Sequence, residues 1–256
     1  MGQPLDSPSH QLPLGLSSLP APSRADGVVG RNAAALEALD SALRGHPAAQ
    51  TPVGPRAVYL WGPPGCGKTF WLSAFAREHP EVRRLLRCGQ PMSRDSPAHA
   101  LEAQASDAPL VWLIDDVHLA NPDEQACLFT LYNQAMQHNA PIVFAADRPP
   151  RHMKSREDLR TRLGQCLVFE LAELSEPEMR DALRERALVL GWLSHAEQDS
   201  FDRLFDYLLS RLPRNLSLLT ELLQIVDRRA LSLKRPISLP LVRSLIDETL
   251  ASQTKP

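Results

Sequence analysis

The stretch GPPGCGKT at residues 62–69 has the residue types and the spacing of a phosphate-binding loop. Its glycines allow the backbone to curl, so that successive N–H groups point at phosphate oxygens. Lys68 adds a compact cation for the outer phosphates, and the hydroxyl of Thr69 is a ligand for Mg²⁺. The stretch therefore predicts a site for ADP or ATP with Mg²⁺, and the residues expected to contact the nucleotide are Gly62, Gly65, Cys66, Gly67, Lys68 and Thr69.

Acidic residues follow two later apolar runs. The run LVWLIDD ends in Asp115 and Asp116, and the run PIVFAAD ends in Asp147. We expect Asp115 to hold Mg²⁺ through water and Asp116 to orient or activate the attacking water. Asp147 would touch the γ-phosphate side of the same site.

These residues need strands and helices to position them. Short, continuous apolar runs predict strands that are buried on both faces, and amphipathic segments between them predict helices. The expected strands are 57–61, 84–88, 108–116, 140–147 and 165–171. The expected helices are one that follows Asn32 as its N-cap, 68–78, 122–138 with Pro122 in its first turn, and 155–163 with Ser155 as its N-cap.

The pattern changes at Ser175. Ser175 and Glu178 have the spacing of a capping box, which predicts a helix that ends before Gly191. Further helical segments follow at about 194–211, 214–231 and 238–251. Strands that alternate with helices, followed by helices alone, predict an α/β fold with a parallel sheet flanked by helices and then an all-helical lid. We place a disordered, proline-rich arm at 1–24, the α/β nucleotide-binding domain at 25–172 and the helical lid domain at 173–256.

The composition excludes several classes of protein. The 28 Lys and Arg residues against 30 Asp and Glu argue against a strongly basic nucleic-acid binder. The four cysteines form no C-x-x-C pair, which predicts free thiols. The sequence has neither the pattern of a signal peptide nor an apolar run of the ~18 residues that a membrane-spanning helix needs. We therefore expect a cytoplasmic protein with no membrane partner.

The motifs GPPGCGKT, LIDDVH and AADRPP, with VVGRNAAAL ahead of the first strand, together resemble the AAA+ ATPases and, within them, the DnaA initiator group. The stretch FTLYNQAMQ and the later DRPPRHM are similar to the Hda-type regulators of DnaA. The resemblance covers about residues 25–252. Since the chain ends soon after LVRSLIDETL, we expect it to lack the C-terminal DNA-binding domain of the initiators.

The resemblance implies roles for further residues. The segment VVGRNAAAL corresponds to one that packs on adenine, which implicates Val29. The stretch LRTRLGQ resembles the arginine-finger region and makes Arg162 the residue that would reach a neighbouring subunit's nucleotide, although the tryptophan that usually follows is missing. Ser217 stands where the initiators have a nucleotide-contacting arginine, and Arg214 is the candidate to replace that contact.

The stretch QLPLGL at 11–16 places leucines at alternate positions of the arm. In Hda-type proteins the arm carries a clamp-binding peptide of the form Gln-Leu-x-Leu-x-Leu. The resemblance therefore assigns contacts with the DNA polymerase III sliding clamp to Gln11, Leu12, Leu14 and Leu16. An extended segment can insert leucines into a preformed apolar pocket while the glutamine bonds at its rim.

These expectations leave three functions open. The first is a regulator that binds the DNA-loaded clamp and stimulates ATP hydrolysis by DnaA, with DNA contacted only through the clamp. The second is a self-contained AAA+ ATPase that acts as a loader or remodelling subunit. The third is a scaffold whose nucleotide only stabilises the fold. The sequence alone does not distinguish ADP from ATP, activity in isolation from activity with a partner, or a monomer from a homo-oligomer.

Overall fold

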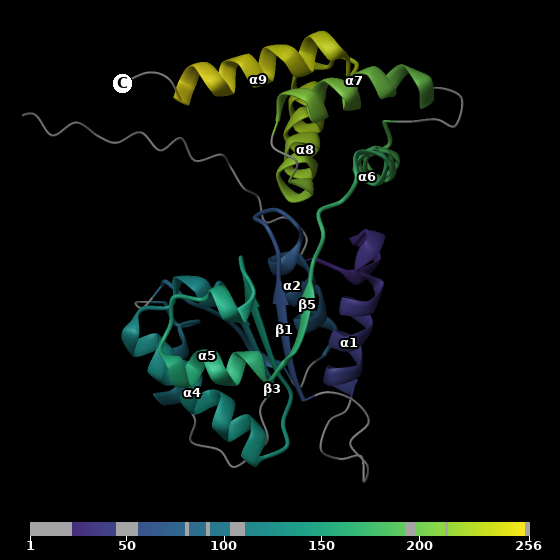
Figure 1. Ribbon diagram of the computed structural model, residues 1–256. Helices are drawn as coiled ribbons and strands as arrows, with labels where there is room; N and C mark the ends of the chain where they lie inside the picture. The colour runs from purple at the N-terminus through teal and green to yellow at the C-terminus, as the bar shows by residue number, and fades with distance from the viewer. Residues whose placement is uncertain are drawn as a thin grey trace, which may run out of the picture.

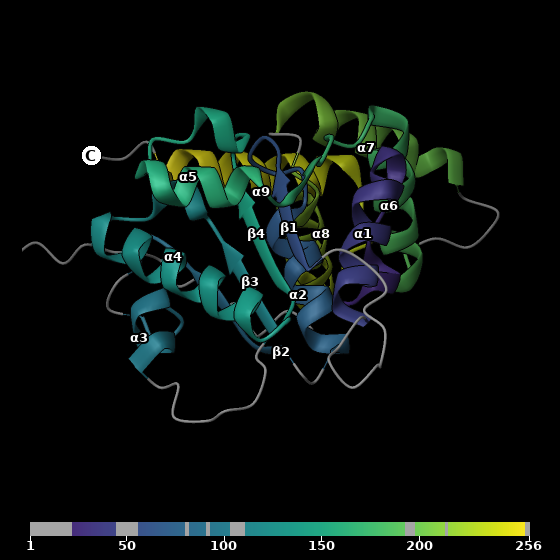
Figure 2. The same cartoon turned by 60° about the horizontal axis from the view of Figure 1, so that its bottom comes forward.

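The computed structural model describes residues 22–44, 56–79, 82–90, 93–102, 111–192, 198–212 and 215–253. At its centre is a parallel sheet of five strands in the order β2-β3-β4-β1-β5 (Figures 1 and 2). The strands are β1 (Ala57–Trp61), β2 (Val82–Arg87), β3 (Val111–Asp115), β4 (Ile142–Ala146) and β5 (Leu167–Glu170).

The register of the strands brings three turns together at one edge of the sheet. Trp61, at the end of β1, lies opposite Ala146, at the end of β4. On the other side of β4, Phe144 lies opposite Ile114 of β3. Because the strands are parallel, the turns that follow β1, β3 and β4 leave from the same edge. In open parallel sheets, ligands bind at the carboxyl ends of the strands, and this edge carries the polar residues predicted to bind a nucleotide.

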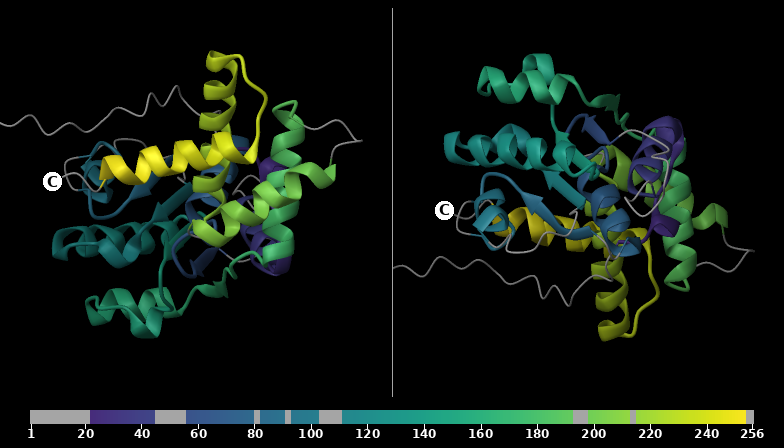
Figure 3. Two further views of the ribbon diagram at one scale, coloured as in Figure 1. Left: turned by 90° about the horizontal axis from the view of Figure 1, so that it is seen from above. Right: turned by 90° about the horizontal axis from the view of Figure 1, so that it is seen from below.

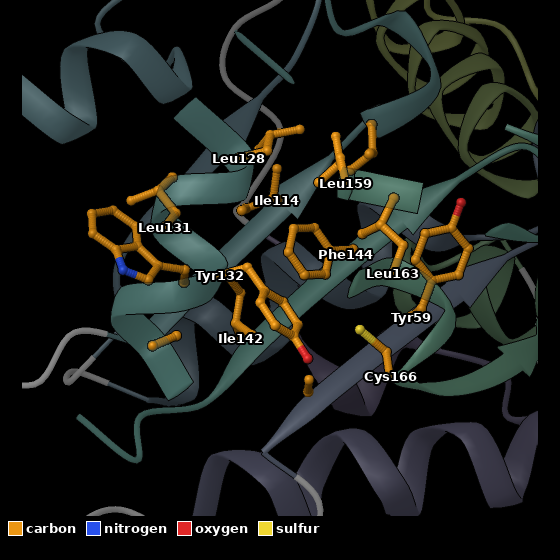
Figure 4. Close-up of a cluster of buried hydrophobic side chains, with 14 of the residues drawn as sticks. Tyr59, Ile114, Leu128, Leu131, Tyr132, Ile142, Phe144, Leu159, Leu163 and Cys166 are labelled. Atoms are coloured by element: carbon orange, nitrogen blue, oxygen red, sulfur yellow. The ribbon is translucent and has the colours of Figure 1, made fainter. Parts of the chain in front are cut away.

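Helices cover both faces of the sheet (Figure 2). The helices α1 (Ala33–Arg44) and α2 (Lys68–Glu78) lie on one face, and α3 (Pro97–Glu102), α4 (Pro122–Gln137) and α5 (Glu157–Gly164) on the other. Successive residues of β1 alternate between the two faces: Val58 and Leu60 pack with α1 and α2, whereas Tyr59 joins Phe144 in the cluster beneath α4 and α5 (Figure 4). Burial on both faces explains why the strands are continuous apolar runs.

Four helices follow the sheet in the described part of the chain: α6 (Glu176–Val189), α7 (Gln198–Arg211), α8 (Leu216–Leu233) and α9 (Leu239–Gln253). They enclose a core of their own around Leu183, Phe205 and Leu223. Figure 1 shows this helical part above the sheet, and Figure 3 shows it from above and below. The predicted fold class is confirmed: a parallel sheet flanked by helices is followed by an all-helical lid.

The caps expected from the sequence are partly correct. The predicted capping box at Ser175 and Glu178 is present at the start of α6, but the other two caps are wrong. Asn32 lies in a short 3₁₀ helix, η2 (Gly30–Asn32), and its side chain bonds to the backbone of Ala172 rather than to α1. The N-cap of α5 is Arg156 rather than Ser155, and the Arg156 N–H donates to the side chain of Gln125 on α4. The helix α3 was not predicted, because its six residues are too few to show a helical repeat.

Candidate nucleotide-binding site

The phosphate-binding loop connects β1 to α2, as predicted. Gly65 and Gly67 have φ angles of 86° and 98°, in the left-handed region that residues with a Cβ avoid. Gly67 is the N-cap of α2, so the loop passes directly into the N-terminus of a helix of 11 residues. Such a helix end presents free N–H groups and the positive end of the helix dipole to an anion.

Lys68 fills the inside of this loop. Its side chain is buried, with the residue only 8% exposed, and its Nζ donates hydrogen bonds to the carbonyl oxygens of Gly62, at 2.7 Å, and Pro63, at 2.9 Å. The Sγ of Cys66 lies 3.6 Å from the same Nζ, and burial raises the pKa of this thiol. The hydrogen bonds of this ammonium group within the described residues go to uncharged partners, so the site is well suited to a phosphate, because an anion would compensate the charge that burial has stripped of water.

Thr69 and Asp115 bring together the two halves of the predicted Mg²⁺ site. The Thr69 Oγ1 donates to Asp115 Oδ2 at 2.5 Å, across the gap between α2 and the end of β3. Asp115 is fully buried, and its Oδ1 accepts from the N–H of Asp116 at 2.9 Å. A hydroxyl and a carboxylate are oxygen ligands of the kind Mg²⁺ takes, and Mg²⁺ usually completes its shell with water and nucleotide phosphates. Within the described residues, no group of three or more His, Cys, Asp or Glu side chains could hold a metal by itself.

Asp116 has an unusual backbone and an unusual pKa. Its φ is 56°, in the left-handed region, and it precedes the short helix η3 (Val117–Leu119). Burial first, and then the negative charge of Asp115, raise the pKa of the Asp116 carboxyl above its usual range. A raised pKa makes a carboxylate a better proton acceptor, as the predicted role in activating water requires.

Asp147 lies one residue beyond β4 and is bound by its neighbour. The guanidinium of Arg148 donates two hydrogen bonds to this carboxylate, each of 2.6 Å. The same hydrogen bonds hold the pKa of Asp147 below its usual range. His118, which follows the Asp115–Asp116 pair, places its Nδ1 3.9 Å from Asp147 Oδ1. Neither His118 nor Arg148 was predicted as a site residue. The approach of His118 to Asp147 depends on how β3 and β4 end side by side, whereas Arg148 is the next residue in the chain.

Residues 22–32 run from α2 to the start of the lid. Gly27 packs so closely on Trp71 that an added Cβ would lie 2.4 Å from the ring. At the other end Asn32 accepts from the N–H of Ala172, at 2.8 Å, and donates to its carbonyl, at 3.1 Å. Between them Val29 is 43% exposed. An apolar side chain open to solvent in this position suits the predicted contact with adenine, which stays a prediction.

Arg162 lies outside this cluster. It is in the last turn of α5, where its guanidinium lies over the rings of Phe129 and Tyr132 at 6.0 and 5.8 Å and donates to Gln165 Oε1 at 3.3 Å. The helix α5 ends shortly before β5, whose first residue is level with the beginning of β1. The phosphate-binding loop leaves the opposite end of β1, so Arg162 is not part of its own chain's phosphate site.

Several predicted site residues lie outside the described residues and stay predictions. These are Gln11, Leu12, Leu14 and Leu16 of the arm and Arg214 of the lid.

Glu124 is a buried polar residue that the sequence did not single out for the site. It is 1% exposed, and its Oε2 accepts from the N–H groups of Asn121, at 3.0 Å, and Gly89, at 3.1 Å. It thereby joins the start of α4 to the turn after β2, beside the acidic end of β3. The spacing of Asn121 and Glu124 is a capping-box signal that could have revealed the first bond, but the second depends on tertiary packing.

Comparisons with known proteins identify related families and similar folds. The family model for the bacterial DnaA ATPase domain matches residues 94–170, and the model for the Hda lid domain matches residues 178–246. Domain III of the Thermotoga maritima initiator DnaA superposes with a TM-score of 0.67 at 19% identity, over 90% of this chain and 98% of that one. AMPPCP-bound DnaA from Aquifex aeolicus gives a TM-score of 0.59 at 20% identity, over 80% of this chain and 65% of that one.

Proteins with other functions have a similar fold. The Thermotoga maritima RuvB Holliday junction branch migration motor gives a TM-score of 0.55 at 18% identity, over 85% of this chain and 67% of that one. A protein of Haemophilus influenzae, described as uncharacterized, is 23% identical over 74% of this chain and 80% of its own length. No helix in the described ranges combines the length and the apolar character needed to cross a bilayer.

The parallel sheet, the phosphate-binding loop and the helical lid define an AAA+ protein. The DnaA ATPase and Hda lid matches narrow the class further: the chain is an Hda-type, DnaA-related AAA+ protein, and it is related to the proteins of replication initiation.

Proposed function

We propose that this protein binds an adenine nucleotide, docks on the DNA-loaded sliding clamp and stimulates ATP hydrolysis by DnaA, so that initiation is not repeated. The observation that carries the proposal is the separation of two functional groups. The phosphate site of this chain is formed by Lys68, Thr69 and Asp115, whereas Arg162 lies near the opposite edge of the sheet. Arg162 is then directed at a nucleotide bound by another molecule.

The surroundings of Arg162 support this role. Within the described part of the chain, its partners are the amide of Gln165 and two aromatic rings, and no carboxylate pairs with it. A guanidinium that pairs with no carboxylate of the described residues is able to pair with an anionic group of another molecule. Placed against the phosphoryl group of DnaA-bound ATP, it would stabilise the charge that develops on the transferring oxygens.

The nucleotide of this chain would then have a positioning role. ADP or ATP would bind through the loop at 62–69, with Mg²⁺ held by Thr69 and Asp115 and adenine against Val29. A bound nucleotide stabilises the folded arrangement of sheet and lid, by an amount that grows with the logarithm of its concentration relative to its dissociation constant. The orientation of the α/β and lid parts toward DnaA would depend on this site.

The test of the arginine finger is a reconstituted reaction with ATP-bound DnaA and clamp loaded on DNA. Arg162→Ala should abolish the stimulation of ATP hydrolysis while binding to DnaA and nucleotide persists. Arg160→Ala removes the same charge from the same helix and should leave the stimulation in place. Unchanged stimulation by Arg162→Ala would overturn the proposal.

The clamp contact is tested separately, on the arm. The double variant Gln11→Ala and Leu12→Ala should release the protein from the clamp without changing its thermal unfolding temperature, because the peptide would bind as an extended segment. Retained clamp binding would contradict the assignment of QLPLGL.

A self-contained ATPase is the second candidate, and the set Thr69, Asp115 and Asp116 favours it. These residues supply the Mg²⁺ ligands and a carboxylate with a raised pKa. Robust ATP turnover by the isolated protein, lost in Asp116→Asn, would support this candidate over the regulator.

A further inference from the structure

The end of β4 lies between the two halves of the nucleotide site. On one side is β1, and the N–H of Gly62, the first residue of the phosphate-binding loop, donates to the carbonyl of Ala146 at 3.3 Å. On the other side is β3, which ends in Asp115. Asp147 is the next residue after Ala146, so its carboxylate lies at the edge where phosphates and Mg²⁺ are expected. A bare carboxylate would repel a triphosphate in this position.

The structure supplies two groups that counter this negative charge. The guanidinium of Arg148 binds the Asp147 carboxylate through both of its oxygens, at 2.6 Å each, in the bidentate geometry that makes such pairs strong. The carbonyl of Arg148 accepts a hydrogen bond from the buried hydroxyl of Tyr59, at 2.8 Å, which fixes the backbone of this turn to β1. The backbone of Arg148 is therefore held by Tyr59, while its side chain is held by Asp147.

His118 approaches Asp147 from η3. Its Nδ1 is buried, makes no hydrogen bond within the described part of the structure, and lies 3.9 Å from Asp147 Oδ1. A buried ring nitrogen this close to a carboxylate contributes a second positive or dipolar group, and it approaches Oδ1, the oxygen that also accepts from Arg148 Nε. It adds to the neutralisation without a direct bond.

We propose that Arg148, assisted by His118, sets the preference of this site between nucleoside triphosphate and diphosphate by neutralising Asp147. The inference rests on the nucleotide site of the proposed function. With Arg148 in place, Asp147 and Arg148 form a pair with no net charge, and the terminal phosphate of ATP meets no repulsion there. Without it, the carboxylate opposes the terminal phosphate, which ADP lacks. Removing Arg148 should therefore weaken the binding of ATP and not that of ADP.

The test measures dissociation constants for Mg·ATP and Mg·ADP by calorimetry on the purified full chain, with neither DnaA nor clamp present. Arg148→Gln should weaken ATP binding by about tenfold or more and ADP binding by less than about threefold. The side chain is 42% exposed, so the variant should fold with only a small fall in the thermal unfolding temperature from the lost pair with Asp147. Arg151→Gln, at an exposed position of the helix η4 (Pro150–His152), removes the same charge close by and should change neither constant.

A second variant separates neutralisation from direct phosphate contact. Adding Asp147→Asn to Arg148→Gln removes the carboxylate that needs neutralising, and ATP affinity should rise above that of Arg148→Gln alone. His118→Asn should shift the ATP-to-ADP ratio in the same direction as Arg148→Gln but less. ATP affinity that stays low in the double variant, or equal losses for ATP and ADP in Arg148→Gln, would overturn the proposal. A wild-type protein that binds neither nucleotide would instead refute the nucleotide site of the proposed function.

Discussion

Replacing Asn32 by alanine should destabilise the protein through the junction between the α/β part and the lid. The Asn32 side chain is buried, at 3% exposure, and it satisfies both the N–H and the carbonyl of Ala172, which connects β5 to α6. Losing a partner for a buried polar group costs about 1–3 kcal/mol. Ala172 is only half-buried, so water can replace part of the loss, and we expect about 2 kcal/mol in total.

The assay is unfolding followed by circular dichroism, with heat and with urea. For a chain of this size, about 2 kcal/mol corresponds to a fall of about 4–8 °C in the unfolding temperature. Glu37→Ala, at an exposed position of α1, is the matched control and should stay within about 0.5 kcal/mol of wild type. If Asn32→Ala also stays within that margin, the two hydrogen bonds to Ala172 do not hold the junction, and the reasoning fails.

Three further predictions concern the loop, the end of β4 and the lid. Gly67→Ala should cost about 1–2 kcal/mol of stability, because a Cβ at a φ of 98° is strained, and should also weaken ADP binding measured by calorimetry. Arg148 holds the pKa of Asp147 below its usual range in the folded protein, so the pair adds stability at neutral pH that is lost as the pH falls through that lowered value. The difference in unfolding free energy between wild type and Asp147→Asn should therefore begin to shrink near about pH 5 and continue to shrink as the pH falls below the usual pKa of an aspartate carboxyl, and a constant difference would contradict the linkage. Trp192→Phe removes the indole N–H that donates to Asp227 at 2.8 Å, and urea unfolding should show a loss of about 1–3 kcal/mol.

The elements of the fold were largely predictable from local patterns. The strand at 57–61 and the helix at 68–78 have the bounds expected from the sequence, because an apolar run and an amphipathic repeat are properties of consecutive residues. The phosphate-binding loop was predictable for the same reason, since its glycines, lysine and threonine are contiguous. The helix α3 escaped prediction because it is too short to repeat.

The side-chain partners were much less predictable. Asn32 has the residue type of an N-cap, yet it binds Ala172, which is 140 residues away in the chain. Ser155 likewise does not cap α5: the N-cap is Arg156, whose backbone N–H donates to Gln125 on α4. In each case a contact between distant elements outweighed a local preference worth only about 1 kcal/mol.

The sequence by itself determined the class of chemistry and the order of the elements, because a phosphate-binding loop and the periods of strands and helices are written in neighbouring residues. The tertiary structure alone decided which charges meet. The parallel register places Asp115 beside Thr69, brings His118 to Asp147, and separates Arg162 from the phosphate site of its own chain. Coulomb energies and hydrogen bonds depend on distances of a few ångströms between groups that are far apart in sequence, and only the packing of the strands and helices sets those distances.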